Sequence, residues 1–135
     1  MIQVSELRVG NWVNMLHGNV QIEKFVDRGV HATDGNGSIF KHLDPIQITP
    51  EILKKAGFDE CADGNEYRIG LPLGNGTDLV IETLEQDSGP YDVLISDTTA
   101  DEVPKHFSYV KAVRYLHQLQ NLYFAIAGTE LEIKL

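Results

Sequence analysis

Residues 115–128, YLHQLQNLYFAIAG, carry the pattern that decides how this fold is assembled. At 100° per residue, one broad stripe of the segment is apolar. The members of this stripe are Tyr115, Leu116, Leu119, Leu122, Tyr123, Ile126 and Ala127. The pattern predicts an α-helix that buries this stripe, and Gly128 is suited to end the helix in the left-handed conformation.

A second stripe of the same helix is mostly polar. Val113, His117, Gln120 and Phe124 follow one another at spacings of four, three and four residues, with Asn121 beside them. No acid or base occurs from residue 115 to residue 129, and a charge-free helix is usually covered on more than one side. We therefore predict that the leucines pack against a C-terminal sheet. His117, Gln120 and the core aromatic Phe124 would pack against an N-terminal barrel or a second subunit.

This second stripe and the single tryptophan form the candidate interaction or interdomain surface. Its members are Trp12, His117, Gln120, Asn121 and Phe124. Buried amides need hydrogen-bond partners, so Gln118, Gln120 and Asn121 are predicted to bond to backbone groups of loops or edge strands. A ligand site on the same stripe is the alternative. For Trp12 we favour packing at one end of the barrel over a place in a peptide-binding groove.

The N-terminal part of the chain alternates in the manner of short strands. LRVGNWVNML places Leu7, Val9, Val13 and Met15 on one side, with a bend at Gly10-Asn11. VQIEKFV and SIFKHL read as further strands, separated by a turn at residues 35–37, Gly-Asn-Gly. Such short strands hide their edges best by curling, so residues 1–48 are predicted to form a small SH3-like β-barrel.

Residues 49–135 are predicted to form an α+β subdomain, joined to the barrel as one compact unit. ITPEILKKAGF reads as a short helix with Thr49 as N-cap, Pro50 in its first turn and Gly57 at its end. The strands expected after it are centred on Ile69, LVIETLE, YDVLI and YVKAV, and LEIKL would be a last strand. The fold class is α+β, with a short helix and an antiparallel sheet followed by the C-terminal helix.

Composition and charge exclude several classes of protein. The chain has 135 residues, 42% of them hydrophobic and a net charge of -9, which suits one or two small domains. Residues 59–102 hold twelve acids and the single base Arg68. Such a segment repels phosphates, so we expect no direct nucleic-acid binding and a surface that mainly aids solubility. No apolar run is long enough for a membrane span. The N-terminal residues do not resemble a signal peptide, so we expect a cytoplasmic protein.

Three patches of the chain resemble one family of small uncharacterised proteins. ELRVGNWV, ITPEILKKAGF and YLHQLQNLYFAIAGTELEI occur in the order of the family's own opening, helix and tail motifs. Leu116 stands where the family usually has valine, and Ala127 where it has threonine. The family occurs in gut anaerobic bacteria and in their phages and mobile elements. The resemblance implies a bacterial or phage cytoplasm, and it brings no catalytic residue with it.

The residue types that carry chemistry form no motif. The five histidines, His17, His31, His42, His106 and His117, include no pair at metal-binding helical spacing. Cys61 is surrounded by acids, which raise rather than lower a thiol pKa, so it is expected to be inert. We find no phosphate-binding loop and no nucleophile motif. We therefore assign no catalytic residue, no cofactor and no metal.

Three hypotheses of function follow. The first is a non-enzymatic interaction or accessory protein that binds another protein or a copy of itself. The second is a phage or mobile-element inhibitor whose acidic half mimics nucleic acid against a basic host protein. The third is a small enzyme with an unrecognised site of histidine and carboxylate. Exposed apolar surface would favour the first, acids in two phosphate-like rows the second, and a buried, converging histidine and carboxylate the third.

Overall fold

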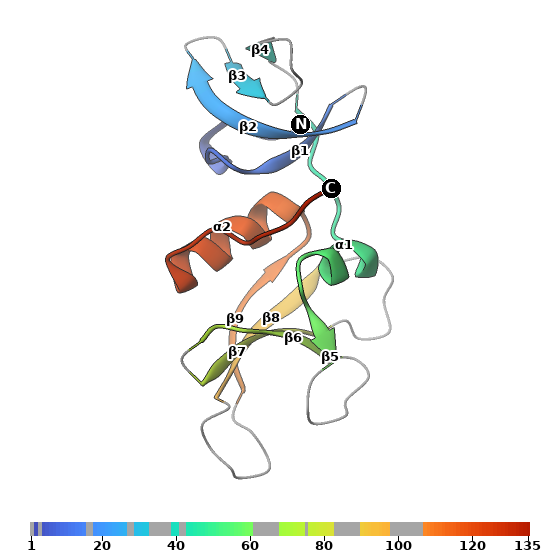
Figure 1. Cartoon of the computed structure of the whole chain (residues 1–135), viewed down its shortest axis with the longest axis vertical. Coiled ribbons are helices and arrows are strands. Elements are labelled where there is room, and N and C mark those ends of the chain that lie inside the picture. Colours follow the sequence, from blue (N-terminus) through green and yellow to red (C-terminus); the bar gives the residue numbers. More distant parts are fainter. Residues whose placement is uncertain are drawn as a thin grey trace. The chain divides into compact units, whose positions relative to one another are not determined.

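A computed structural model gives the architecture in two compact units (Figure 1). It describes residues 2, 4–15, 18–26, 29–32, 39–40, 43–60, 68–74, 76–82, 90–97 and 107–135. Unit 1 combines Met1–Gln47 with Tyr115–Leu131, and unit 2 combines Ile48–Arg114 with Glu132–Leu135. The C-terminal helix therefore groups with the N-terminal strands, whereas the predicted division at residue 48 placed it with residues 49–135.

Unit 1 contains a four-stranded antiparallel sheet in the order β1-β2-β3-β4. After the 3-10 helix η1 (Val4–Glu6), the strands are β1 (Trp12–Met15), β2 (Gly18–Val26), β3 (Gly29–Ala32) and β4 (Ile39–Phe40). Val13 lies opposite Val20 in the β1–β2 register. These two belong to the buried cluster Ile2, Leu7, Val13, Val20, Ile22 and Leu43. The strand predicted over residues 20–26 is confirmed, whereas η1 was not foreseen.

The described residues of unit 1 form no closed barrel, so the structure confirms an antiparallel sheet and not the finer SH3-like prediction. A short continuation of the chain nevertheless pairs with the edge of β1. Asn14 N donates to Asp44 O at 2.8 Å, and Asp44 N donates to Asn14 O at 3.0 Å. This antiparallel bridge covers part of the edge that β2 leaves open.

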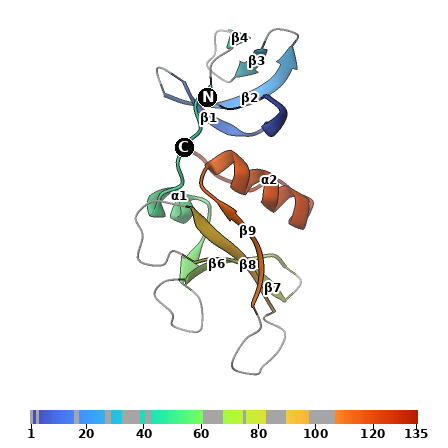
Figure 2. The same cartoon turned by 180° about the vertical axis from the view of Figure 1, so that it is seen from behind.

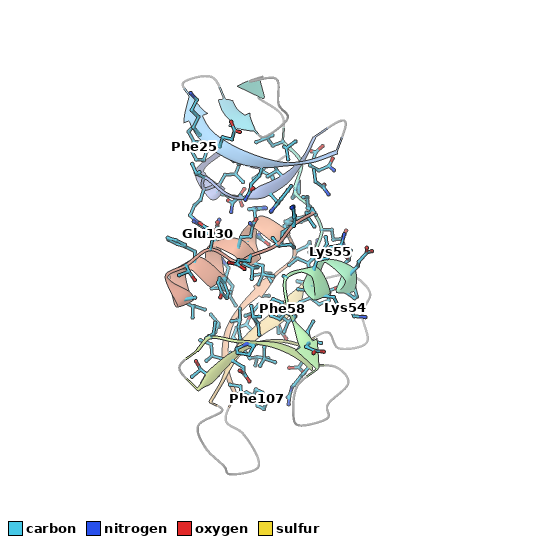
Figure 3. The ribbon with its side chains drawn as sticks, in the orientation of Figure 1. Phe25, Lys54, Lys55, Phe58, Phe107 and Glu130 are labelled. Carbon is cyan, nitrogen blue, oxygen red and sulfur yellow. The ribbon has the colours of Figure 1, made fainter. Side chains whose placement is uncertain are left out.

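In unit 2, helix α1 (Pro50–Lys55) has the ends that its sequence predicts. The Thr49 hydroxyl accepts the Ile52 N–H at 3.2 Å, and Pro50 occupies the first turn. Gly57 has φ +96°, and Phe58 N donates to Leu53 O at 3.0 Å, which closes the helix end. Phe58 is buried, as expected for a residue that folds back over the last turn (Figure 3).

The rest of unit 2 is a five-stranded antiparallel sheet in the order β5-β6-β7-β8-β9 (Figure 2). Its strands are β5 (Asp59–Glu60), β6 (Arg68–Pro72), β7 (Thr77–Glu82), β8 (Tyr91–Asp97) and β9 (Phe107–Val113). The β7 residues Leu79, Val80 and Ile81 are all buried, so this central strand is covered on both faces. The Arg68 guanidinium lies 4.3 Å from the Phe107 ring centroid although β7 and β8 separate their strands. Such a contact requires a strongly coiled sheet.

Two sequence predictions about strands are wrong, for the same reason. Residues 131–135, LEIKL, alternate as a strand should, yet they form no strand in the described structure. Residues 59–60, which are not among the strands predicted above, form β5 because they reach the edge of β6, where Asp59 lies opposite Gly70. A strand needs a neighbour with free backbone groups, and alternation does not supply one. Among the described residues, neither α-helix is long and apolar enough to cross a membrane.

Thr49→Ala should lower the free energy of unfolding by about 1 kcal/mol, because it leaves the Ile52 N–H without its cap. Thr49→Ser keeps the hydroxyl and should stay near wild type. Urea denaturation of the two variants measures the difference. Equal losses in both variants would show that the methyl group of Thr49, and not the cap, matters at this position.

Candidate functional site: the polar face of helix α2

Helix α2 (Leu116–Ala127) begins and ends where the sequence predicts. The Tyr115 N–H donates to the Gln118 side-chain oxygen at 3.1 Å, which satisfies a backbone group at the helix start. Gly128 has φ +76°, and its N–H donates to Phe124 O at 2.9 Å. The helix is thus closed at both ends by its own residues, and its lateral faces carry the candidate site.

The polar face of α2 meets a tight turn at residues 8–11, just before β1. Asn11 N donates to Arg8 O at 3.1 Å, and the Asn11 side-chain oxygen accepts the Arg8 N–H at 2.7 Å. Gly10 has φ +95°, as the third residue of a type II turn requires. The turn directs Val9 into solvent, where it is 51% exposed. Our prediction that Val9 lines up with Leu7 and Val13 is therefore wrong, because the turn interrupts the strand.

Gln120 bonds to the edge of β1 as a neighbouring strand would. Its side-chain oxygen accepts the Trp12 N–H at 2.8 Å, and its side-chain nitrogen donates to Gly10 O at 3.1 Å. One carboxamide thus satisfies a donor and an acceptor two residues apart on the same strand edge. Gln120 is only 1% exposed, so its side chain makes these hydrogen bonds shielded from water. The prediction that Gln120 bonds to an edge strand is confirmed.

Asn121 holds the 8–11 turn from the next position of the helix. Its side-chain oxygen accepts from Asn11 Nδ2 and from Arg8 Nε, each at 2.9 Å, and its side-chain nitrogen donates to Glu6 O at 2.8 Å. The amide therefore joins η1, the turn and α2 through three hydrogen bonds. Only the bond to Glu6 O is to the backbone, so the predicted backbone bond of Asn121 is confirmed, but it is made to η1 and not to a loop or edge strand.

Arg8 completes the network and connects it with the residues that follow α2. Its guanidinium donates to both carboxylate oxygens of Glu130, at 2.7 and 3.3 Å, and to Gln120 O at 3.3 Å. The guanidinium carbon also lies 4.2 Å from the centroid of the Phe124 ring. Glu130 is labelled next to α2 in Figure 3. Sequence reasoning missed Arg8 and Glu130, because only the fold reveals that these two charges meet.

Phe124 and Trp12 differ from the buried amides. Phe124 is 39% exposed, so the prediction of a core aromatic is wrong; its ring lies against Arg8 at the margin of the network. Trp12 is half-buried and contributes its backbone N–H to the network. Leu116 and Leu119 are fully buried. Their contact with the C-terminal sheet stays a prediction.

His117 is the one member of the predicted surface that the network leaves out. It is 2% exposed, and neither ring nitrogen has a hydrogen-bond partner in the part of the chain that the structure describes. Its ring stacks on the Tyr115 ring, with centroids 6.0 Å apart. Burial lowers the pKa of His117 below its ordinary value, and the nearby charge of Glu6 opposes this effect only in part.

The other histidines and the acidic residues form no metal-binding cluster among the described residues. Cys61, His17, His42 and His106 lie outside the described residues. Within the ranges described, no three residues among His, Cys, Asp and Glu are grouped as metal ligands. Of the acidic segment, Asp59 is exposed, while Asp78, Glu82 and Asp92 are half-buried. Arg68 lies 3.9 Å from the Glu82 carboxylate.

Comparison with known proteins adds no relative to this picture. The chain matches no protein-family model, no curated protein and no solved structure. The resemblance of its three patches to a bacterial and phage family therefore stays a prediction. Two of these patches, RVGNW and HQLQN, do meet in space, since Arg8, Gly10, Asn11 and Trp12 bond to Gln120 or Asn121. These hydrogen bonds join the N-terminal and the C-terminal segments of unit 1.

Gln120→Leu should lower the free energy of unfolding by about 2 kcal/mol or more, since it removes the acceptor of the part-buried Trp12 N–H and one donor to Gly10 O. Gln47→Leu makes the same chemical change on an exposed side chain and should cost about 0.5 kcal/mol at most. Urea denaturation compares the two variants. Similar stabilities would show that the carboxamide is not what holds α2 to β1.

Proposed function

We propose that this chain is a non-enzymatic interaction or accessory protein of the bacterial or phage cytoplasm. We place its contact with a partner protein on Val9 and Phe124, named here the Val9–Phe124 patch. The observation that supports this most is the exposure, 51% and 39%, of these two apolar side chains at residues that adjoin Arg8, one along the chain and one by contact of its ring. Val9 follows Arg8 in the turn, and Phe124 stacks on the Arg8 guanidinium.

The Val9–Phe124 patch is held rigid before any partner arrives. Arg8 is fixed by Glu130, Asn121 and the Gln120 carbonyl, and the Phe124 ring rests on Arg8. A preorganised side chain loses little conformational entropy on binding, which raises affinity. Phenylalanine and arginine are also enriched at the cores of protein interfaces. Because Glu130 balances the charge of Arg8, the patch suits a partner that presents an apolar face.

The N-terminal strands supply a frame for this patch, and we infer that the frame is a small SH3-like barrel. The support is the pairing of Asp44 with Asn14 on the edge of β1 that faces away from β2. A meander of four strands whose chain returns to its first strand is the arrangement that removes free edges from a small sheet. The open edges that invite aggregation would then be absent from the neighbourhood of the patch.

The two other hypotheses have less support. An enzyme would need polar groups left available for a substrate, whereas Gln120, Asn121 and Arg8 are engaged with one another or with the backbone. His117 makes no hydrogen bond with Glu6, and the His117 ring is buried whereas Glu6 is exposed. A nucleic-acid mimic would need acids in exposed rows. Of the acids that the structure describes in this segment, Asp78, Glu82 and Asp92 are half-buried and Asp59 is exposed, and six of the twelve acids lie outside the described residues.

Phe124→Ala and Phe25→Ala form a matched pair, because the two phenylalanines are 39% and 40% exposed; Phe25 projects from β2 (Figure 3). Phe124→Ala should cost about 1–2 kcal/mol of stability, less than the loss of a fully buried aromatic side chain, because its ring is partly in solvent. It should weaken partner binding about tenfold or more, as expected for a central contact residue. Phe25→Ala should leave binding unchanged.

The binding test uses a photo-reactive amino acid in place of Val9, in bacterial cells that produce the full chain. We expect a discrete cross-linked product that Phe124→Ala removes and Phe25→Ala retains. Mass spectrometry of the product distinguishes a different protein from a second copy of the chain. Cross-linking that is the same in both phenylalanine variants would refute the Val9–Phe124 patch as the contact surface.

A further inference from the structure

The buried imidazole of His117 is a polar group without a matching environment. A neutral imidazole carries one N–H donor and one nitrogen acceptor, and both nitrogens of His117 lack a hydrogen-bond partner within the described residues. Buried polar groups are normally paired, because leaving them unpaired is unfavourable. An apolar side chain of similar size would avoid this penalty. Packing therefore does not explain why histidine occupies this position. What histidine has and an apolar side chain lacks is the ability to gain a proton.

The position of His117 links that proton to the junction between α2 and β1. His117 lies three residues before Gln120 and four before Asn121, so the three side chains share one face of the helix. Gln120 and Asn121 make the hydrogen bonds to β1 and to the 8–11 turn. A charge that appears on the His117 ring is thus placed beside the bonds that dock the helix.

The charged groups around this face do little to accommodate an imidazolium. Glu6, in η1, is the charged group whose field favours the protonated ring, but its side chain is exposed and no hydrogen bond joins it to His117. Arg8, in the 8–11 turn, and Glu130, after the end of α2, form an ion pair with each other. Tyr115 stacks on the ring through its aromatic face. Among the described residues, a protonated His117 would therefore be buried without an acceptor.

We propose that His117 makes the docking of α2 on β1 acid-sensitive, so that proton uptake by its imidazole releases Gln120 and Asn121 from β1 and the 8–11 turn. The proton is better accommodated in water, where an imidazolium has acceptors, than in the docked structure. Release would also free Arg8 from Asn121 and from the Gln120 carbonyl. This inference does not rest on the proposed protein contact, since it concerns the internal junction of unit 1.

The sign of the pH dependence follows from the burial of the ring. Burial lowers the pKa of His117 in the folded protein, so the unfolded chain takes up the proton first as pH falls. The stability that the neutral ring contributes is complete above the ordinary histidine pKa of about 6.5. It is lost progressively as pH falls from there toward the lower pKa of the folded protein.

The test compares wild type with His117→Leu by urea denaturation at about pH 7.5 and about pH 5, on either side of the ordinary histidine pKa. Trp12, the only tryptophan, reports by fluorescence because its backbone N–H bonds to Gln120. We expect the urea midpoint to fall more between the two pH values for wild type than for His117→Leu. The fall that is seen in His117→Leu measures the contribution of the other titrating groups. Equal falls would overturn the proposal.

A second measurement does not depend on whether the leucine variant folds. Proton NMR titration of the wild-type histidine rings should show one ring, absent from spectra of His117→Phe or His117→Leu, whose protonation coincides with loss of the native Trp12 signals. If only one of these variants folds, it still identifies the ring. A His117 ring that takes up its proton while Trp12 keeps its native signals would overturn the proposal.

Glu6→Gln gives the proposal a directional test. Removal of this carboxylate takes away the field that favours the protonated His117 ring. The difference between the proton affinity of His117 in the folded protein and in the unfolded chain should therefore become larger. The urea midpoint of Glu6→Gln should fall more steeply with acid than that of Glu23→Gln, which changes an exposed carboxylate on β2. A smaller acid effect in Glu6→Gln than in Glu23→Gln would contradict the proposal.

Discussion

The carboxamide of Gln120 bonded to the edge of β1 is the interaction on which unit 1 depends. It joins two segments that are 110 and 108 residues apart in the sequence, at Gly10 and Trp12. A strand edge carries backbone donors and acceptors that need partners when they are buried. Each hydrogen bond contributes only about 0.5–1.5 kcal/mol net, but the loss of one partner leaves a buried group unsatisfied, which costs more. The helix is thereby held in one register on the strand.

The geometry of the 8–11 turn follows from this constraint. For Gly10 O to accept from Gln120, the chain must turn immediately before β1, and Gly10 supplies the positive φ that the turn requires. The Asn11 side chain holds the turn from within and is itself held by Asn121. The same turn moves Val9 into solvent and directs Arg8 toward α2. An exposed apolar side chain and a fixed guanidinium thus result from one backbone requirement.

A hydrogen-bonded polar junction between helix and sheet gives specificity rather than great stability. Leucines at the positions of Gln120 and Asn121 would bury more apolar area, but they would not select one register of the helix along β1. In such a junction a buried group without hydrogen-bond partners is conspicuous, and within the part of the chain that the structure describes His117 is such a group. The junction therefore has two parts. In the fixed part, Gln120 and Asn121 are held by hydrogen bonds. In the other part, the energy of the buried His117 ring depends on its protonation. The proposed contact surface lies on the fixed part.

The sequence by itself determined the local structure. Helix ends at Thr49, Gly57 and Gly128, the strands other than β3 and β5, and the need of Gln120 and Asn121 for partners all follow from residue chemistry over a few neighbours. Only the tertiary structure decided which backbone groups those amides bond, that Arg8 meets Glu130 and Phe124, and that LEIKL forms no strand. It also assigned α2 to the unit of the N-terminal strands. These outcomes depend on contacts between residues far apart in the chain, and periodicity and capping carry no information about such contacts.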